Sequence, residues 1–294
     1  MTEGATDRLV LLGTKGGPAI RPGGPMPTAS LLQIGGRLCV IDCGLGVTKG
    51  LVEAGVSLKS LDLILITHLH SDHVLELGPL LHTAWTTGLA TPVTVFGPKG
   101  TQAVWDGFCA SLAYDIDLRI EDEGRPDLRK LAHVVEYAEG PLPVNGLSVR
   151  ALRVDHPPVT DCFALRFDSA RWSVTFSSDT CHFPPLADFA KGTDILIHEA
   201  MLAAGVDRLV AKTGNGARLK EHIVRSHTEA RDAARIAQTA GAGRLVLHHL
   251  VPADDPGISD ADWHASMAGH FDGPIEIGHD GMELRPQPQT QPAM

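Results

Sequence analysis

The chain has 294 residues, of which 43% are hydrophobic and 20% charged, a composition that is ordinary for a globular protein with a full hydrophobic core. It carries 25 Lys and Arg against 35 Asp and Glu, and the net charge of −10 gives no electrostatic reason to expect affinity for nucleic-acid backbones or anionic membranes. Residues 1–8 lack a signal-peptide pattern, and no apolar stretch approaches the roughly 20 residues that span a bilayer. We therefore expect a cytoplasmic protein with neither a membrane nor a nucleic acid as partner.

Short β-rich runs alternate with helical patterns along the chain. The predicted strands cover residues 8–13, 30–34, 37–42, 62–67, 92–96, 132–137, 147–154, 162–167, 173–177, 194–198 and 244–247. The predicted helices cover residues 47–54, 73–87, 99–113, 185–190 and 228–240. This order indicates an α/β or α+β protein with mixed sheets covered by helices. No linker divides the chain, so we predict one domain over residues 1–285 and a disordered polar tail over residues 286–294.

Two residue types show where to look for chemistry. The five cysteines are scattered and contain no C-x-x-C pair, which argues against a disulfide framework and a cysteine zinc knuckle. The chain also has 15 histidines, which is unusually many. Histidine is therefore the residue type in which a reactive site should be sought.

The densest group of histidines follows the buried-type strand at 62–67. It comprises His68, His70 and His73, with Asp72 among them. A lone histidine is more often a core or surface group, but His68 and His70 alternate along an extended segment and so lie on one side of it. Imidazole and carboxylate together suit zinc, manganese or iron, and the absence of nearby thiols argues against a purely structural site. The segment therefore predicts a metal site.

Further candidate ligands follow later strands. His156, Asp179 and the pair His248-His249 each come at the end of a predicted strand. Such positions can direct side chains from distant parts of a chain into one cleft. Alone, each is weak, because an Asp there usually caps a turn and a His is usually solvated. Together with the first group they strengthen the metal hypothesis.

These residues resemble the metallo-β-lactamase superfamily, for which H-x-H-x-D-H is a specific motif. The turn at 155–158 differs from the Gly-His-Thr-x-Gly turn of lactonases, glyoxalase II-like enzymes and β-lactamases. Other segments resemble the ribonuclease Z, arylsulfatase-like and phosphodiesterase branch, namely residues 11–18, 41–44, 178–180, 197–200, 226–228 and 245–249. The resemblance implies the metallo-β-lactamase fold, an αββα sandwich of two mixed β-sheets flanked by helices.

The resemblance also implies a dinuclear site with two divalent metal ions, for which we expect Zn2+, with Mn2+ and Fe as alternatives. It assigns the ligands as His68, His70 and His156 for one ion, Asp72, His73 and His249 for the other, and Asp179 as the bridge. His248 competes with His249 for the last position. We prefer His249 because the family's ligand is followed by an apolar residue, here Leu250.

The implied activity is that of a metal-dependent hydrolase, in which a metal-bridging hydroxide cleaves a small carboxylic, phosphoric or sulfuric ester. Asp72 would orient the hydroxide as well as bind metal. By the same resemblance His227 is the candidate proton donor and Glu199 its orienting partner, whereas the alternative interpretation is a helix-flanking histidine and a solvated carboxylate. Dimers are common in the family, so a homodimer is a further expectation.

The leading alternative is a ribonuclease Z-like tRNA 3′ endonuclease or a phosphodiesterase. Ribonuclease Z typically inserts a long flexible arm between the equivalents of His156 and Asp179, and here residues 157–178 leave no room for one. A basic stretch is the best argument for an anionic substrate, although a solvated loop is the competing interpretation; its cations are Arg208, Lys212, Arg218, Lys220 and Arg225. A remote alternative, iron-dependent redox chemistry, is disfavoured by the complete second set of ligands.

Three segments are expected to line the pocket: residues 14–28, 105–117 and 205–222. Four aromatic residues either form a pocket wall or belong to the core, namely Trp85, Trp105, Phe108 and Tyr114. The sequence leaves these two interpretations open.

Overall fold

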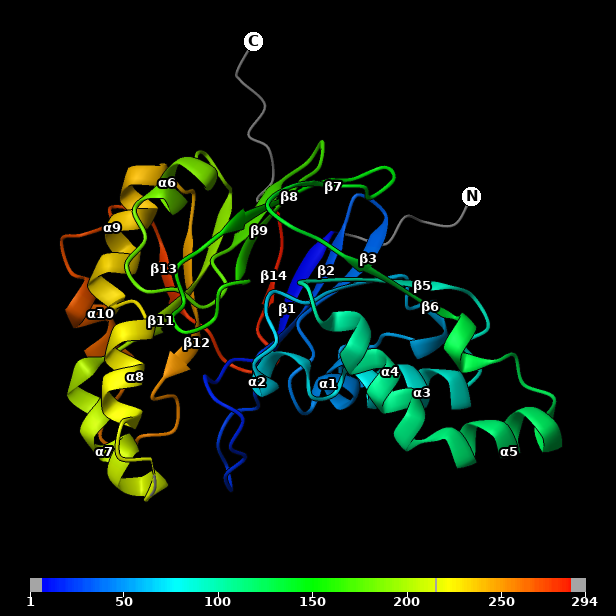
Figure 1. Ribbon diagram of the computed structural model, residues 1–294. Helices are drawn as coiled ribbons and strands as arrows, with labels where there is room; N and C mark the ends of the chain where they lie inside the picture. The colour runs from blue at the N-terminus through cyan, green and yellow to red at the C-terminus, as the bar shows by residue number, and fades with distance from the viewer. Residues whose placement is uncertain (1–6, 215, 287–294) are drawn as a thin grey trace, which may run out of the picture.

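Two seven-stranded mixed sheets stack face to face at the centre of the computed structural model, which describes residues 7–214 and 216–286 (Figure 1). The first sheet has the order β14 (Glu283–Leu284), β1 (Arg8–Gly13), β2 (Ala29–Ile34), β3 (Arg37–Ile41), β4 (Leu63–Leu65), β5 (Val93–Gly97) and β6 (Ala132–Glu136). The second has the order β13 (Ile275–Ile277), β12 (Leu245–Val251), β11 (Ile195–Met201), β10 (Ser173–Phe176), β9 (Phe163–Asp168), β8 (Ser148–Arg153) and β7 (Gly140–Leu142).

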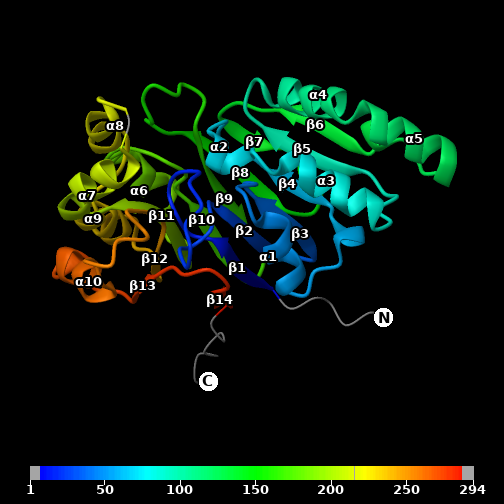
Figure 2. The same ribbon diagram turned by 90° about the horizontal axis from the view of Figure 1, so that it is seen from below.

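Helices cover the outer face of each sheet. Those of the first half of the chain are α1 (Val47–Glu53), α2 (Ser71–Val74), α3 (Leu77–Thr86), α4 (Thr101–Ser111) and α5 (Ala113–Glu123). Those of the second half are α6 (Pro185–Phe189), α7 (Ala203–Thr213), α8 (Leu219–Ser226), α9 (Ala230–Ala240) and α10 (Asp260–Met267). Figure 2 shows the two groups on opposite sides of the paired sheets. The predicted αββα sandwich is thereby confirmed.

Strand β1 illustrates why the central strands are apolar on both faces. Leu9 and Leu11 point into the core between the two sheets, while Val10 and Leu12 point into the core beneath α1 and α3. Because successive side chains of a strand alternate between faces, a strand that is covered on both sides is an almost continuous apolar run.

Helix α9 packs closely on β11 and β12 because its buried face is made of small residues. Ala230, Ala233, Ala234 and Ala237 recur at helical spacing and are fully buried. The helix ends where Gly241 adopts the left-handed conformation (φ 62°), for which glycine has no steric penalty.

Several predicted elements need correction. The single helix predicted over 73–87 is two helices, α2 and α3, because Glu76 between them turns its carboxylate onto the start of α1, where it accepts hydrogen bonds from the Gly46 and Thr48 amides at 2.5 and 2.9 Å. The loop expected over 205–222 is mostly helical, because it includes the larger part of α7 and the first turn of α8. The elements missed altogether include α5, α10, β7, β13 and β14.

The predicted tail over 286–294 lies outside the described residues from position 287 onward. Within residues 7–214 and 216–286, none of the helices combines the length and the hydropathy that a bilayer crossing requires.

Candidate functional site

The candidate site begins where the chain leaves β4. Asp42 is a buried residue in the left-handed conformation (φ 61°), and its carboxylate contacts two residues of the segment that follows β4. One of its carboxylate oxygens accepts a hydrogen bond from the Thr67 amide at 2.8 Å, and the other lies 2.8 Å from His73 Nδ1. The contact orients the His73 ring and leaves its Nε2 for another partner. Asp42 was not among the predicted site residues, although it lies in the segment 41–44 that carries the family resemblance.

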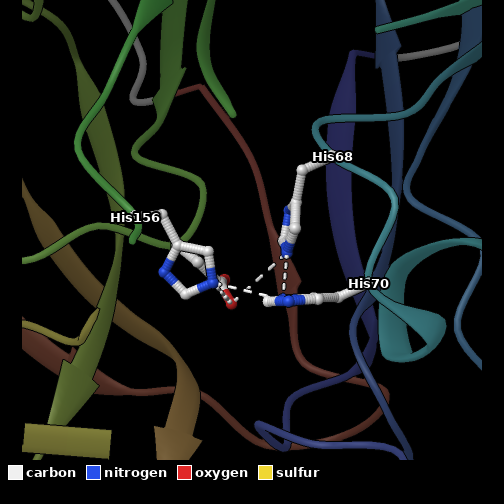
Figure 3. A group of neighbouring side chains, drawn as sticks. His68, His70 and His156 are labelled. Atoms are coloured by element: carbon white, nitrogen blue, oxygen red, sulfur yellow. Dashed lines mark hydrogen bonds and ion pairs between the residues drawn. The ribbon is translucent and has the colours of Figure 1, made fainter. Parts of the chain in front are cut away.

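The first cluster of side chains joins both halves of the chain. His68 and His70 come from the segment after β4, and His156 follows β8 in the second sheet; the three rings point toward one another (Figure 3). His68 Nε2 and His156 Nε2 lie 3.0 and 3.2 Å from His70 Nδ1. Nitrogens bound at 2.0–2.1 Å to one tetrahedral zinc ion would lie about 3.3 Å apart, so this spacing fits a shared cation.

The second cluster consists of Asp72, His73 and His249. His249 Nε2 and His73 Nε2 lie 3.3 and 3.7 Å from Asp72 Oδ2. Asp179 Oδ2 lies between the two clusters, at 3.1 Å from His249 Nε2 and 3.4 Å from His73 Nε2. The structure therefore brings all seven predicted ligands together, with Asp179 shared.

The same oxygen, Asp179 Oδ2, also faces the first cluster. It lies 3.7 Å from both His68 Nε2 and His156 Nε2. The His156 ring is fixed from the other side, since its Nδ1 lies 2.9 Å from the Ser226 carbonyl oxygen and so donates to it. This leaves Nε2 with its lone pair turned toward the cluster.

Buried polar atoms without partners support a cation at this place. Within the described part of the chain, His73 Nε2 and the second oxygen of the shared carboxylate, Asp179 Oδ1, are buried and have no hydrogen-bond partner. Burying such atoms unpaired is costly, so native proteins keep few of them. The imidazole and carboxylate clusters thus fit a dinuclear metal site.

The protonation of the first cluster and of the two carboxylates agrees with metal binding, whereas at His73 burial lowers the pKa but the carboxylates around it more than compensate and raise it. Burial lowers the pKa of His68, His70 and His156, so these rings are neutral at pH 7 and can coordinate a metal. Burial alone would raise the pKa of Asp72 and Asp179, but the neighbouring imidazoles, His73 and His249, more than offset this and lower it. Both carboxylates are therefore ionised.

The alternative ligand His248 is turned away. Its Nε2 lies 2.9 Å from the Gly13 carbonyl oxygen, whereas His249 has a positive φ of 44° and belongs to the second cluster. The pairing of β11 with β12 shifts at this point, so the two neighbouring histidines do not follow simple strand alternation. Gly16 lies against His249, and a Cβ at Gly16 would be 2.7 Å from His249 Cε1.

His227 and Glu199 lie at the edge of the clusters. His227 Nδ1 is 3.3 Å from Glu199 Oε1, which also accepts hydrogen bonds from the Thr180 and Thr228 amides, each at 3.1 Å. Burial lowers the pKa of His227, but the Glu199 carboxylate more than compensates and raises it to about 9. His227 is therefore protonated at neutral pH and can donate a proton.

A pocket of about 370 Å³ opens above the clusters. Two of the three segments that were expected to line it do so, since its walls are formed by the loop after β1 and by α7 and α8. Their lining residues are Lys15, Gly16, Gly17, Pro18, Ala19, Arg21, Leu209, Thr213, Leu219, His222 and Ile223. Lys15 was missed as a site residue, because a lone cation in a Gly/Pro-rich loop resembles an ordinary turn residue.

The third expected segment does not line this pocket. Trp85 and Trp105 are buried in the core beneath the first sheet, and Phe108 packs against that core. Tyr114 on α5 is 84% exposed. The structure therefore favours the core interpretation for the first three residues and leaves Tyr114 on the surface.

Comparison with known proteins identifies relatives along most of the chain. The family model described as Anti-Pycsar protein Apyc1 matches residues 8–226. The ribonuclease Z of Mycobacterium bovis is 35% identical over 276 residues, which cover 92% of this chain and 95% of that protein. The ribonuclease Z of Mycobacterium marinum is 35% identical over 278 residues, with 92% and 96% covered.

Solved structures show the same fold at lower identity. The metallo-β-lactamase fold protein YhfI from Bacillus subtilis has a TM-score of 0.71 and 21% identity, with 95% of this chain and 99% of that chain covered. Human tRNase Z, short form, has a TM-score of 0.65 and 20% identity, with 95% and 99% covered. A diphosphatase from the PhnP family has a TM-score of 0.65 and 16% identity, with 95% and 98% covered. The names of the ribonuclease relatives conflict with our expectation that a nucleic acid is an unlikely partner.

Proposed function

The chain belongs to the metallo-β-lactamase fold hydrolases, in the branch that includes ribonuclease Z, and on this premise we propose that it hydrolyses a phosphodiester bond in a small substrate. The observation that carries the proposal is the pocket of about 370 Å³ directly above the two ligand clusters. This volume falls in the range typical of small-molecule sites. The relatives named ribonuclease Z favour a phosphoric ester over the carboxylic and sulfuric esters.

The ligands of two divalent ions, preferably zinc, would be the residues of the two clusters, with Asp179 common to both. When bound, such ions lower the pKa of a coordinated water and offset the charge that develops on phosphorus in the transition state. The Asp72 carboxylate accepts a hydrogen bond from the Gly17 amide at 2.7 Å, which fixes its orientation at the pocket floor. Asp72 is thereby placed to orient the attacking water as well as to hold an ion.

His227 is the proposed proton donor to the leaving oxygen. It lines the pocket, and its Nδ1 is engaged by Glu199, which leaves Nε2 for the substrate. Glu199 is the positioning residue, because its carboxylate binds His227 and two backbone amides at once. The raised pKa of His227, about 9, keeps the proton in place at neutral pH.

Two observations favour a small substrate over an RNA. Residues 169–172 alone connect β9 to β10, so no arm extends from the interval between His156 and Asp179. The basic stretch on α7 and α8 is largely neutralised by ion pairs, namely Arg208 with Asp255 at 2.6 Å, Lys212 with Asp254 at 3.0 Å and Lys220 with Asp207 at 2.5 Å.

Cleavage of tRNA 3′ ends is the second candidate function. It is supported by the 35% identity to proteins named ribonuclease Z over nearly their whole length. The same clusters would serve either substrate, since both reactions cleave a phosphodiester.

The experiment that tests the proposal combines metal analysis with initial rates. The panel contains three p-nitrophenyl substrates, namely a phosphodiester, a carboxylic ester and a sulfate ester. A precursor tRNA is the fourth substrate. About two metals per chain and chelator-sensitive hydrolysis of the phosphodiester alone are expected. Trimming of the tRNA at a higher kcat/KM would establish the second candidate, and turnover only of the carboxylic or sulfate ester would contradict both.

A further inference from the structure

Lys15 is a buried cation at the wall of the pocket. Only 3% of its surface is exposed, and it lines the pocket beside Gly16 and Gly17. Its Nζ donates a hydrogen bond to the Gly17 carbonyl oxygen at 2.7 Å, while the Gly17 amide donates to Asp72. Lys15 is therefore separated from the second ligand cluster by a single residue.

The ammonium group of Lys15 retains unused hydrogen-bonding capacity. An ammonium carries three donors, and among the described residues only the Gly17 carbonyl accepts from it. No carboxylate within the described ranges forms an ion pair with Lys15. A charged group buried in this way is costly unless a partner of opposite charge arrives.

The nearby acidic residue does not serve this purpose. Asp254 already accepts from Arg21 at 3.2 Å and from Lys212 at 3.0 Å. Asp254 thus already has two cationic partners, and the two cations that line the pocket, Lys15 and Arg21, give the wall formed by the loop after β1 its positive charge. Another part of the lining is apolar, with Leu209, Leu219 and Ile223 contributed by α7 and α8. The pocket therefore combines a cationic wall, an apolar wall and a metal-binding floor.

We propose that Lys15 binds a second anionic group of the substrate, so that the pocket selects compact phosphodiesters that carry an additional phosphate or carboxylate. The proposal rests on the proposed function, because it assigns the scissile phosphodiester to the clusters and the second anion to Lys15. The apolar wall would then hold the part of the substrate that links the two charges.

Three matched substrates test this division. They are p-nitrophenyl phosphodiesters with the same alkyl arm, which ends in a phosphate, a carboxylate or a neutral amide. With the metal-loaded wild-type protein we expect the anionic arms to have a kcat/KM about tenfold above that of the amide arm, since a hydrogen bond to a charged group contributes on this scale. The ratio of kcat/KM between the phosphate and carboxylate arms shows which of the two anions the pocket prefers.

Lys15→Met should abolish this preference through a higher KM for the anionic arms, so that the ratio of kcat/KM between the anionic arms and the amide arm falls to about one, whatever loss all three arms share through the Gly17 contact. Lys15→Arg should restore part of the preference, which separates charge from packing. Lys220→Met is the matched control, because Lys220 is exposed, pairs with Asp207 and does not line the pocket. Its preference should equal that of the wild type.

Calorimetric titration with phosphonate analogues of the same arms provides a second readout that does not need turnover. Tighter binding of the anionic arms to wild type than to Lys15→Met supports the proposal even if the chromogenic esters are poor substrates. Equal binding of all arms to wild type, or an equal loss for all arms in Lys15→Met, overturns the proposal while leaving the proposed function intact. If the analogues bind as expected but no phosphodiester is hydrolysed, the proposed function is contradicted. The proposed binding role of Lys15 is then not affected.

Discussion

Gly16 determines the position of a ligand without binding metal itself. A Cβ at this position would lie 2.6 Å from Val251 Cγ2 and 2.7 Å from His249 Cε1, so one of these side chains must move. We predict that Gly16→Ala lowers the metal content from about two ions to about one per chain and reduces kcat on the order of 100-fold, because small displacements at a reactive centre cost that much. Elemental analysis and initial rates measure the two effects.

The control is Gly107→Ala in α4. No atom lies within 4 Å of a Cβ at this position, and alanine is favoured over glycine in a helix by about 1 kcal/mol. This variant should keep both metals and an equal or higher Tm. If Gly16→Ala also keeps both metals and full turnover, the second cluster is more tolerant than the contact distances indicate.

The proposed role of His227 depends on the leaving group of the substrate. His227→Ala should lower kcat about 100-fold or more for an alkyl phosphodiester, whose leaving oxygen needs a proton, and much less for a p-nitrophenyl ester. Both metals should remain bound. His82→Ala is the matched control, because His82 contacts Asp115 at 2.9 Å and lies outside the pocket.

Two outcomes would contradict this assignment. Equal losses for both leaving groups would show that His227 does not act as the acid. Loss of one metal would make it a ligand instead, which is a real alternative because His227, Asp179 and His249 also form a group of metal-binding geometry.

For individual residues, the sequence predicted which side chains come together in the candidate site. It did not predict all of the contacts that surround them. The spacing of His68, His70 and Asp72 carried a specific signal, and the structure brings them together as expected. The choice between His248 and His249 remained open because simple strand alternation does not reveal the irregular pairing and positive φ near His249. Lys15 lies in the segment 14–28 that was expected to line the pocket, but its proposed role depends on a burial that only the folded loop provides.

Among the elements, α3 and α5 contain aromatic residues in opposite environments. Trp85 on α3 is fully buried, and its Nε1 donates to the Pro126 carbonyl oxygen at 2.8 Å. Trp85→Ala should lower the free energy of unfolding by about 3–5 kcal/mol, as large-to-small core substitutions do, without changing KM in the folded protein. Urea denaturation measures the loss.

Tyr114→Ala on α5 is the aromatic control. Because this side chain is 84% exposed, its removal should change the free energy of unfolding by no more than about 0.5 kcal/mol. A substrate-specific rise in KM for the Trp85 variant, with unchanged stability, would instead place Trp85 in the pocket.

The predicted elements succeeded where the hydrophobic pattern was long and failed where it was short or mixed. Strands β13 and β14 have three and two residues, too few to show a period. Helix α5 reads as a charged segment with only Ile116 fully buried, so it resembles a loop. Helix α7 did carry a signal at Val206, Leu209 and Val210, which the glycines after it obscured.

For the whole molecule, the ligand clusters connect the two sheets. His68 and His70 follow a strand of the first sheet, whereas His156, Asp179 and His249 belong to the second half of the chain. Bound ions would therefore cross-link the two halves and stabilise the folded state by mass action, by about 4 kcal/mol at a thousandfold excess over Kd. We predict that a chelator lowers the urea midpoint, and that zinc restores it.

The matched control for chelation is the Asp179→Asn variant, in which the shared carboxylate is neutralised. Its urea midpoint should respond much less to chelator and zinc than that of the wild type. An unchanged midpoint in the wild type after complete metal removal, verified by elemental analysis, would contradict a cross-linking role.

The loop after β1 is an early segment whose partners come late in the chain. The Gly16 amide donates to the Leu250 carbonyl at 3.1 Å, the Leu250 amide donates to the Thr14 carbonyl at 2.9 Å, and the Thr14 amide donates to the Asp280 carboxylate at 3.0 Å. Contacts of such sequence separation form slowly and only after the C-terminal part has been synthesised. A nascent or truncated chain that stops before β12 therefore lacks both the pocket wall and the last ligand. A ribosome-bound chain is therefore expected to stay inactive until β12 has been made and has paired with the loop after β1.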